Sequence, residues 1–146
     1  MDEVDLIISE LELYLLGLGS RVWAINDAEF RDKAINLLVE LGWEVDTIRL
    51  FDKGGYVYGF PSEVEIDLLV RGERVIVVEM AGALKRGDVV TAHRKKEFYE
   101  MIKGKKVSDA IVITAFIGER DEDKVLALAK SLGIRVVKPE EIKLLK

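Results

Sequence analysis

Two acids on neighbouring segments of this sequence, Asp67 and Glu79, have the spacing of a paired carboxylate site. Asp67 lies in the alternating stretch EVEIDLLV, and Glu79 follows the β-branched run VIVV at 75–78. The stretch RGER between them is typical of a turn, and a reversal centred on Glu73 puts Asp67 opposite Glu79 in an antiparallel hairpin. Their Cβ atoms would then lie about 5 Å apart on one face of the sheet.

Like charges directly opposite each other destabilise a sheet unless a cation compensates for them. Hard divalent ions such as Mg²⁺ take carboxylate and carbonyl oxygens, so the pair indicates a metal site. Glu65, two residues before Asp67, faces the same side and could add a ligand or a hydrogen bond. Alternatively, the acids only solubilise an exposed sheet face. A register slip of one residue would favour this second interpretation, because Asp67 and Glu79 would then face opposite ways.

The elements that must position these acids follow from the hydrophobic periodicity. We expect helices at 2–16, 27–41, 87–103 and 121–132, a helical turn at 139–141, and strands at 43–51, 56–70, 75–80, 109–116 and 134–137. In the second strand, residues 56–60 begin the return from a turn at 52–55, and Pro61 marks a break. From residue 63 to residue 70, side chains are then expected to alternate between the two faces of the sheet. Three consecutive strands followed by alternating helices and strands predict an α/β fold, a mixed β-sheet flanked by helices on both sides.

The charges are divided unevenly along the chain. Residues 1–46 contain eleven acids and three bases, whereas residues 81–106 contain eight bases and three acids. The basic segment has two interpretations, a solvated helix face or a surface that binds phosphates. The second interpretation predicts DNA contacts from Lys85, Arg86, Arg94, Lys95 and Lys96.

Composition excludes several classes of protein. The chain has 146 residues, 49% of them hydrophobic, which suits one domain with a core of its own. It has no cysteine and one histidine, so disulfides and zinc sites of the Cys/His type are excluded. No apolar run approaches the roughly 18 residues of a membrane span, and the N-terminus is acidic, so we expect a cytoplasmic protein without membrane contact. The high charge content and the absence of glutamine are typical of proteins from hot environments.

The order of elements and the two acids resemble the PD-(D/E)xK superfamily of restriction-endonuclease-like nucleases. Four segments are similar to an archaeal branch of it: AEFRDKAINLLVELGWEV, GFPSEVEIDLLVRGERVIVVE, LKRGDVVTAHRKKEFYE and SLGIRVVKPEEI. The resemblance implies a restriction-endonuclease-like αβββαβ core, which we assign to residues 18–146. Residues 1–17 then form an extra N-terminal amphipathic helix, whose leucines offer a surface for a homodimer.

The resemblance also implies a site and an activity. It implies that Asp67 and Glu79 bind Mg²⁺ or Mn²⁺, that the backbone carbonyl of Met80 is a third ligand, and that Glu29 approaches the same ion. In such a site the ion polarises a scissile phosphate and acidifies water, so the expected activity is metal-dependent hydrolysis of phosphodiester bonds in DNA.

Ala81 departs from the family pattern, which has a lysine there to orient or deprotonate the attacking water. Three explanations stay open. Lys85 or Lys95 supplies the ammonium in its place; or catalysis is lost and the fold binds nucleic acid or a protein partner; or the alanine was introduced to inactivate a nuclease. In some relatives a polar residue precedes a tyrosine by four positions on the next helix, as Lys95 precedes Tyr99 here. Ordinary helix packing of Tyr99 and a solvated Lys95 explain the two residues equally well.

Overall fold

The computed structural model describes residues 5–6, 9–10, 13, 27–71 and 75–138. Of the predicted N-terminal helix, residues 5, 6, 9, 10 and 13 are helical. The rest of that helix, its dimer surface, most of the turn at 71–74 and the helical turn at 139–141 lie outside the described residues. Within the described part of the chain, no helix is both long and apolar enough to cross a membrane.

Five strands form one mixed sheet in the order β1-β2-β3-β4-β5. The strands β1, β2 and β3 pair in antiparallel fashion, and β4 and β5 continue the sheet in parallel. This arrangement confirms the predicted α/β fold with a mixed sheet. The described elements are, in chain order, α2 (Asp27–Glu40), β1 (Glu44–Asp52), β2 (Ser62–Arg71), β3 (Val75–Leu84), α3 (Arg86–Lys103), β4 (Asp109–Ile117), α4 (Glu122–Ser131) and β5 (Ile134–Val137).

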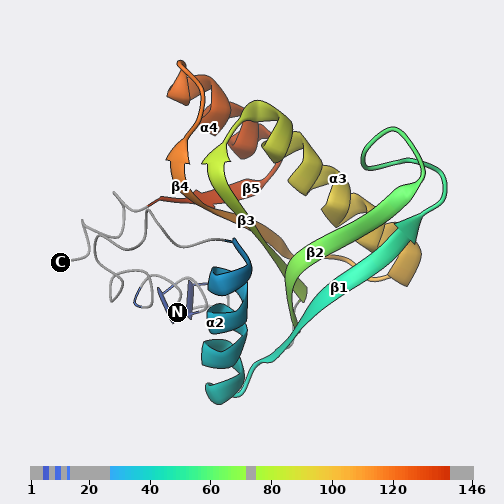
Figure 1. Ribbon diagram of the computed structural model, residues 1–146, viewed down its shortest axis with the longest axis vertical. Helices are drawn as coiled ribbons and strands as arrows, with labels where there is room; N and C mark the ends of the chain where they lie inside the picture. Colours follow the sequence, from blue (N-terminus) through green and yellow to red (C-terminus); the bar gives the residue numbers. More distant parts are fainter. Residues whose placement is uncertain (1–4, 7–8, 11–12, 14–26, 72–74, 139–146) are drawn as a thin grey trace.

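Helices cover both faces of the sheet (Figure 1). On one face, Ala34 and Leu38 of α2 pack against a cluster that includes Leu68 and Val78. On the other face, α3 and α4 pack against β4 and β5 through Val89, Ala92, Val125, Ala129, Val112 and Ile134. Each helix buries side chains three or four residues apart, which is the spacing that predicted it.

The sheet forks between β2 and β3. The two strands pair only from Leu68 to Arg71 and from Val75 to Val78. Beyond Leu68 and Val78 they diverge, because β2 stays with β1 down to Ser62 while β3 stays with β4 up to Leu84. Figure 1 shows the β1–β2 ribbon leaving the β3–β4 ribbon, with α3 crossing behind the gap.

A β-bulge in β2 lies at this fork. Ile66 pairs with Ile48 and Leu69 with Asp46, so both Asp67 and Leu68 stand opposite Thr47. The Thr47 hydroxyl donates a hydrogen bond to the Asp67 carbonyl oxygen at 2.9 Å, which satisfies a backbone group that the bulge displaces. Bulges re-aim side chains beside functional sites, and this one carries Asp67.

The bulge corrects the predicted alternation of β2. We expected period two throughout residues 63–70, with Ile66 and Leu68 on one face. In the structure Ile66 packs with Tyr99 of α3, whereas Leu68 packs in the cluster on the α2 side. The extra residue in β2 shifts the side-chain pattern by one position at Asp67.

The connection between β1 and β2 corrects a second prediction. We expected residues 56–60 to begin the returning strand, but they form turns, and β2 starts at Ser62. The buried Asp52 carboxylate accepts a hydrogen bond from the Val57 amide at 2.8 Å, and Gly55 and Gly59 have positive φ angles. These local bonds and left-handed residues turn the backbone, so it cannot pair in the sheet.

The packing of α2 predicts that two leucines close together in the sequence contribute unequally to the free energy of unfolding. Leu38 is fully buried in the core, whereas Leu41, just beyond the helix, is about half exposed. We expect Leu38→Ala to lower the free energy of unfolding by about 2–5 kcal/mol, because it leaves a cavity. The matched variant Leu41→Ala should change it by less than about 0.5 kcal/mol. Urea unfolding measures both, and similar losses in the two variants would contradict this packing of α2.

Candidate functional site

The fork of the sheet opens into a small pocket beneath α3. Its volume is about 100 Å³. That is room for about three water molecules and well below the several hundred Å³ of sites for organic ligands. An ion with a few small ligands fits this volume. The pocket is lined by Asp67, Glu79, Met80, Ala81, Asp88, Thr91, Ala92, Lys95 and Val112.

Asp67 and Glu79 face each other across the fork. The Asp67 amide donates to Glu79 Oε2 at 2.9 Å, and the Met80 amide donates to Asp67 Oδ2 at 2.8 Å. The neighbouring pair of Leu68 and Val78 confirms the register predicted from a reversal at Glu73. The two carboxylates therefore take over from the backbone ladder at the point where the strands separate.

Lys95 reaches the same pocket from α3. Its Nζ atom lies 2.6 Å from Glu79 Oε1, and the two side chains are only 13% and 9% exposed. This is a charge-assisted contact in a place with little water, where electrostatic interactions are stronger than at the surface. The predicted alternative of a solvated Lys95 is wrong.

The electrostatics of the pocket favour an additional cation. Burial raises the pKa of Glu79 to about 7, the Lys95 ammonium lowers it, and the Asp67 carboxylate raises it. Burial lowers the pKa of Lys95, but the attraction of Glu79, with smaller contributions from Tyr58 and Asp67, raises it above the ordinary value. Lys95 is therefore charged, and more positive charge near Glu79 would favour its ionised form.

The donor set fits a hard divalent ion. Within the described residues, Asp67 Oδ1 accepts no hydrogen bond, and the carboxylates of Asp67 and Glu79 offer oxygen ligands in the same pocket. No group of three or more Asp, Glu, His or Cys side chains placed for a metal occurs in that part of the chain. Mg²⁺ commonly binds through one or two carboxylates and keeps several waters, so two carboxylates suffice.

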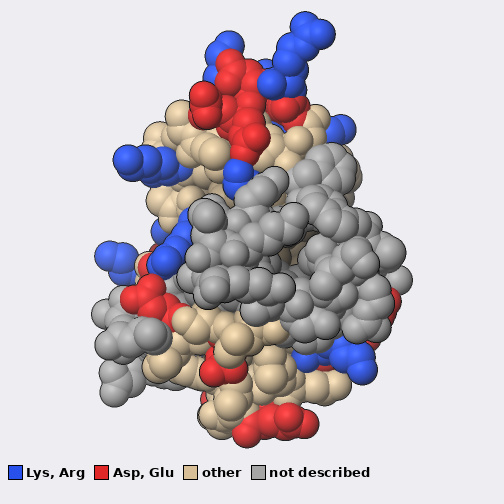
Figure 2. Space-filling view, turned by 90° about the vertical axis from the view of Figure 1, so that its left-hand side faces the viewer, with Lys and Arg blue, Asp and Glu red and all other residues tan. Residues whose placement is uncertain are grey.

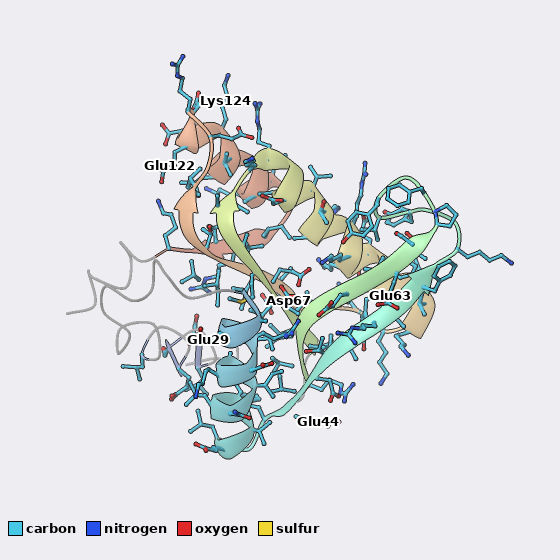
Figure 3. All side chains as sticks on the ribbon, in the orientation of Figure 1. Glu29, Glu44, Glu63, Asp67, Glu122 and Lys124 are labelled. Atoms are coloured by element: carbon cyan, nitrogen blue, oxygen red, sulfur yellow. The ribbon has the colours of Figure 1, made fainter. Side chains whose placement is uncertain are left out.

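Two predicted contributors, Glu29 and Glu65, do not line the pocket. Glu29 is an exposed residue of α2 (Figure 3). Among the described residues it belongs to no group of three side chains placed to hold a metal. Its approach to the ion stays a prediction. Glu65 does not line the pocket, because its carboxylate pairs with Arg31 at 2.5 Å and with Arg49 at 3.7 Å.

The predicted DNA-binding residues are spread over α3 and its start. Lys85 is exposed and does not line the pocket, whereas Lys95 does. Arg86 pairs with Glu119 at 2.8 Å, and Figure 2 shows acidic and basic side chains intermixed at the end of the molecule that carries α4. Arg94 is exposed, and Lys96 is partly buried. The start of α3 is thus partly neutralised by acids, and the predicted DNA contacts stay a prediction.

Ala81 lies at the pocket as predicted, whereas Tyr99 has a packing role. Ala81 follows Glu79 on β3 and lines the pocket, as expected of the position that carries lysine in the family pattern. Tyr99 is buried in a hydrophobic cluster with Ile66, Leu69 and Val77, so helix packing accounts for it.

Sequence reasoning missed two polar residues of the pocket, Asp88 and Thr91. Both lie on α3, and with Ala92 and Lys95 they have the spacing i, i+3, i+4, i+7 of one helix face. Counting back from Lys95 along the predicted helix would have found them. The Asp88 carboxylate also accepts a hydrogen bond from the Lys85 amide at 2.9 Å at the start of α3.

Comparison with known families divides the chain into two matched segments. A model described as the PD-(D/E)XK nuclease superfamily matches residues 62–135, and a model described as a protein of unknown function (DUF3782) matches residues 1–61. No curated protein and no solved structure matches the chain. The two segments meet before β2, although β1 belongs to the same sheet. The predicted domain boundary after residue 17 stays a prediction.

The contact of Lys95 with Glu79 predicts an effect on stability. Lys95→Met keeps most of the side-chain volume but leaves Glu79 buried without its cation, which is costly for a buried pair. Because Glu79 can take up a proton, we expect a loss of only about 1–3 kcal/mol in the free energy of unfolding. Lys96→Met is the matched control and should cost less than about 0.5 kcal/mol. Equal effects in urea unfolding would show that the contact does not stabilise the fold.

Proposed function

Because the chain belongs to the PD-(D/E)XK nuclease superfamily, we propose that it is a Mg²⁺- or Mn²⁺-dependent nuclease that hydrolyses phosphodiester bonds in DNA. One observation carries the proposal. Asp67, Glu79 and Lys95, from two strands and a helix, share a pocket whose volume suits an ion with a few small ligands and is well below that of sites for organic ligands. Nucleases of this superfamily typically use divalent metals and act on nucleic acids.

Asp67 and Glu79 would hold the metal, with the Met80 carbonyl as the third protein ligand. When bound, the ion supplies Lewis-acid polarisation of the scissile phosphate and offsets the charge that develops in the transition state. Asp67 is preorganised for this role, because the Met80 amide fixes Oδ2 at 2.8 Å and leaves Oδ1 for a ligand. The bulge at Asp67 orients the same side chain from its own strand.

Lys95 would take the role of the family's lysine, whose position Ala81 occupies. Its ammonium stays protonated beside Glu79, so it acts first as a hydrogen-bond donor that orients the attacking water and stabilises negative charge on the phosphate. Lys85, the other candidate, is exposed and lies outside the pocket. The contact at 2.6 Å therefore supports Lys95 over Lys85.

A second candidate function is binding of nucleic acid without cleavage. Ala81 favours it, since alanine neither moves a proton nor balances charge. In that case Lys95 would only neutralise Glu79, and the pocket would hold a phosphate without reaction. The two candidates differ in one observable, the cleavage of DNA in the presence of Mn²⁺.

Loss of either carboxylate should abolish cleavage. We expect Asp67→Asn and Glu79→Gln to lower the rate of plasmid cleavage in Mn²⁺ by about 100-fold or more, because each removes a charged oxygen ligand. Calorimetry should show that Mn²⁺ binding is lost in both variants, and chelation should stop cleavage by the unaltered chain. Glu63→Gln is the control, because Glu63 is an exposed acid of the same strand and does not line the pocket. If the unaltered chain binds no Mn²⁺ at millimolar concentration, the catalytic proposal fails.

A rescue experiment tests the role of Lys95. Lys95→Ala should lower the cleavage rate by about 10²–10⁴-fold. Positions 81 and 95 line the same pocket from strand and helix, so adding Ala81→Lys to this variant should restore part of the rate. Lys85→Ala should leave the rate within a few-fold. Full activity of Lys95→Ala, measured well below its unfolding temperature, would rule out Lys95 as the replacement.

A further inference from the structure

The connection between β1 and β2 exposes a group of aromatic side chains that the proposed chemistry does not use. Phe51 and Phe60 are 65% and 60% exposed, and Tyr56 and Tyr58 about 40%. The rings of Tyr58 and Phe60 stack, with centroids 6.3 Å apart and planes inclined by 30°. We call residues 51–60, which carry these four rings, the aromatic loop. Exposed apolar clusters of this kind mark binding surfaces, because exposing them to water has a free-energy cost.

The aromatic loop is held by its own backbone. The buried Asp52 carboxylate accepts from the Val57 amide, and the Gly59 amide donates to the Gly55 carbonyl at 2.9 Å. Gly55 has φ +69°, and a Cβ atom there would lie 2.8 Å from the Phe60 nitrogen. Only glycine permits this approach, so the loop presents its rings on a preorganised scaffold. Preorganisation lowers the entropy lost when a ligand binds.

The aromatic loop lies beside the helix that delivers Lys95 (Figure 1). The Tyr56 hydroxyl donates to Glu97 Oε1 at 2.6 Å, and Arg94 donates to the Val57 carbonyl at 3.4 Å. Val57 packs against Phe98 in a small hydrophobic cluster. Arg94, Glu97 and Phe98 flank Lys95 along α3, so the aromatic loop stands next to the pocket.

The chemistry of this surface indicates what it contacts. A pocket of about 100 Å³ cannot hold a whole nucleotide, so the nucleotides that flank a bound phosphate group lie outside it. Exposed aromatic rings bind the faces of unpaired bases by stacking, and an arginine beside them suits the backbone phosphates. The bases of an intact duplex are already stacked on each other and offer no free face. Arg94 is the basic side chain in this position, bonded to the loop itself.

We propose that the aromatic loop stacks on unpaired bases next to the scissile phosphate, so that the substrate is DNA with unpaired nucleotides beside the cleavage position, such as a fork or a flap. This inference rests on the proposed nuclease function, which supplies the phosphate in the pocket. Phe60 and Tyr58, the stacked pair, are the main contacts to the bases, and Arg94 contacts the adjoining backbone.

Binding without cleavage tests the inference directly. The unaltered chain is titrated in EDTA into a forked DNA with 2-aminopurine in its unpaired arm and into a fully paired duplex of the same sequence. We expect quenching of 2-aminopurine in the fork and an affinity at least about tenfold higher for the fork than for the duplex. Tyr58→Ala and Phe60→Ala should each weaken fork binding by about tenfold and leave duplex binding unchanged.

Two controls make the result specific to the rings. Met101→Ala removes a side chain of α3 that is as exposed as Phe60, at 60%, and should leave fork binding unchanged. Phe60→Trp keeps an aromatic surface and should retain the preference for the fork. Urea unfolding checks that each variant is folded. We expect that it is, because the substituted side chains are exposed.

The inference is overturned by equal affinity for fork and duplex, or by equal effects of Phe60→Ala and Met101→Ala. It is also overturned if Phe60→Ala changes the molecular mass by light scattering but not fork binding, since the loop would then join copies of the chain. The outcome is separable from the nuclease proposal. A preference for the fork that is lost in Phe60→Ala supports base stacking even if Mn²⁺ produces no cleavage. Equal cleavage of fork and duplex contradicts base stacking but leaves the nuclease proposal intact.

Discussion

Where β2 and β3 separate, the carboxylates of Asp67 and Glu79 take the place of backbone carbonyls as hydrogen-bond acceptors. A sheet that forks leaves amides without partners in its ladder, and buried amides without partners are costly. Asp67 Oδ2 accepts the Met80 amide and Glu79 Oε2 accepts the Asp67 amide, so each acid satisfies the opposite strand. The same bonds fix both carboxylates at the pocket, and a single arrangement therefore ends the ladder and builds the site.

The fork has consequences for both faces of the sheet. Beyond it, Glu79 lies on a strand paired only with β4, and burial raises the pKa of its carboxylate to about 7. The core contacts of Val89, Ala92 and Phe98 hold α3 over the opening, and this brings Lys95 to Glu79. On the opposite face Leu38 of α2 packs against the sheet and covers it. The pocket is thus a product of packing around a gap between strands.

Much of the fold and half of the site could be predicted from local patterns. The order of the described elements and the hairpin register, as seen in the pair of Leu68 and Val78, are confirmed, because strand alternation and the hairpin turn are encoded within a few residues. The prediction of a strand at 56–60 was wrong, since β-forming aromatics there belong to a loop closed by Asp52 and two glycines. The alternation through Ile66 and Leu68 was wrong as well, because a bulge is set by the partner strand and its Thr47.

The two acids, their spacing and the absence of lysine at position 81 can be read directly from the chain, since these are properties of residue type and of one hairpin. Which of the two nearby lysines enters the pocket depends, by contrast, on how the helix packs on the sheet. Lys85 and Lys95 are both basic residues near the acids in the chain, but α3 packs across the fork so that Lys95 points into the pocket and Lys85 stays exposed. That choice depends on contacts between a helix and strands distant in sequence. Such contacts are not encoded in any short pattern.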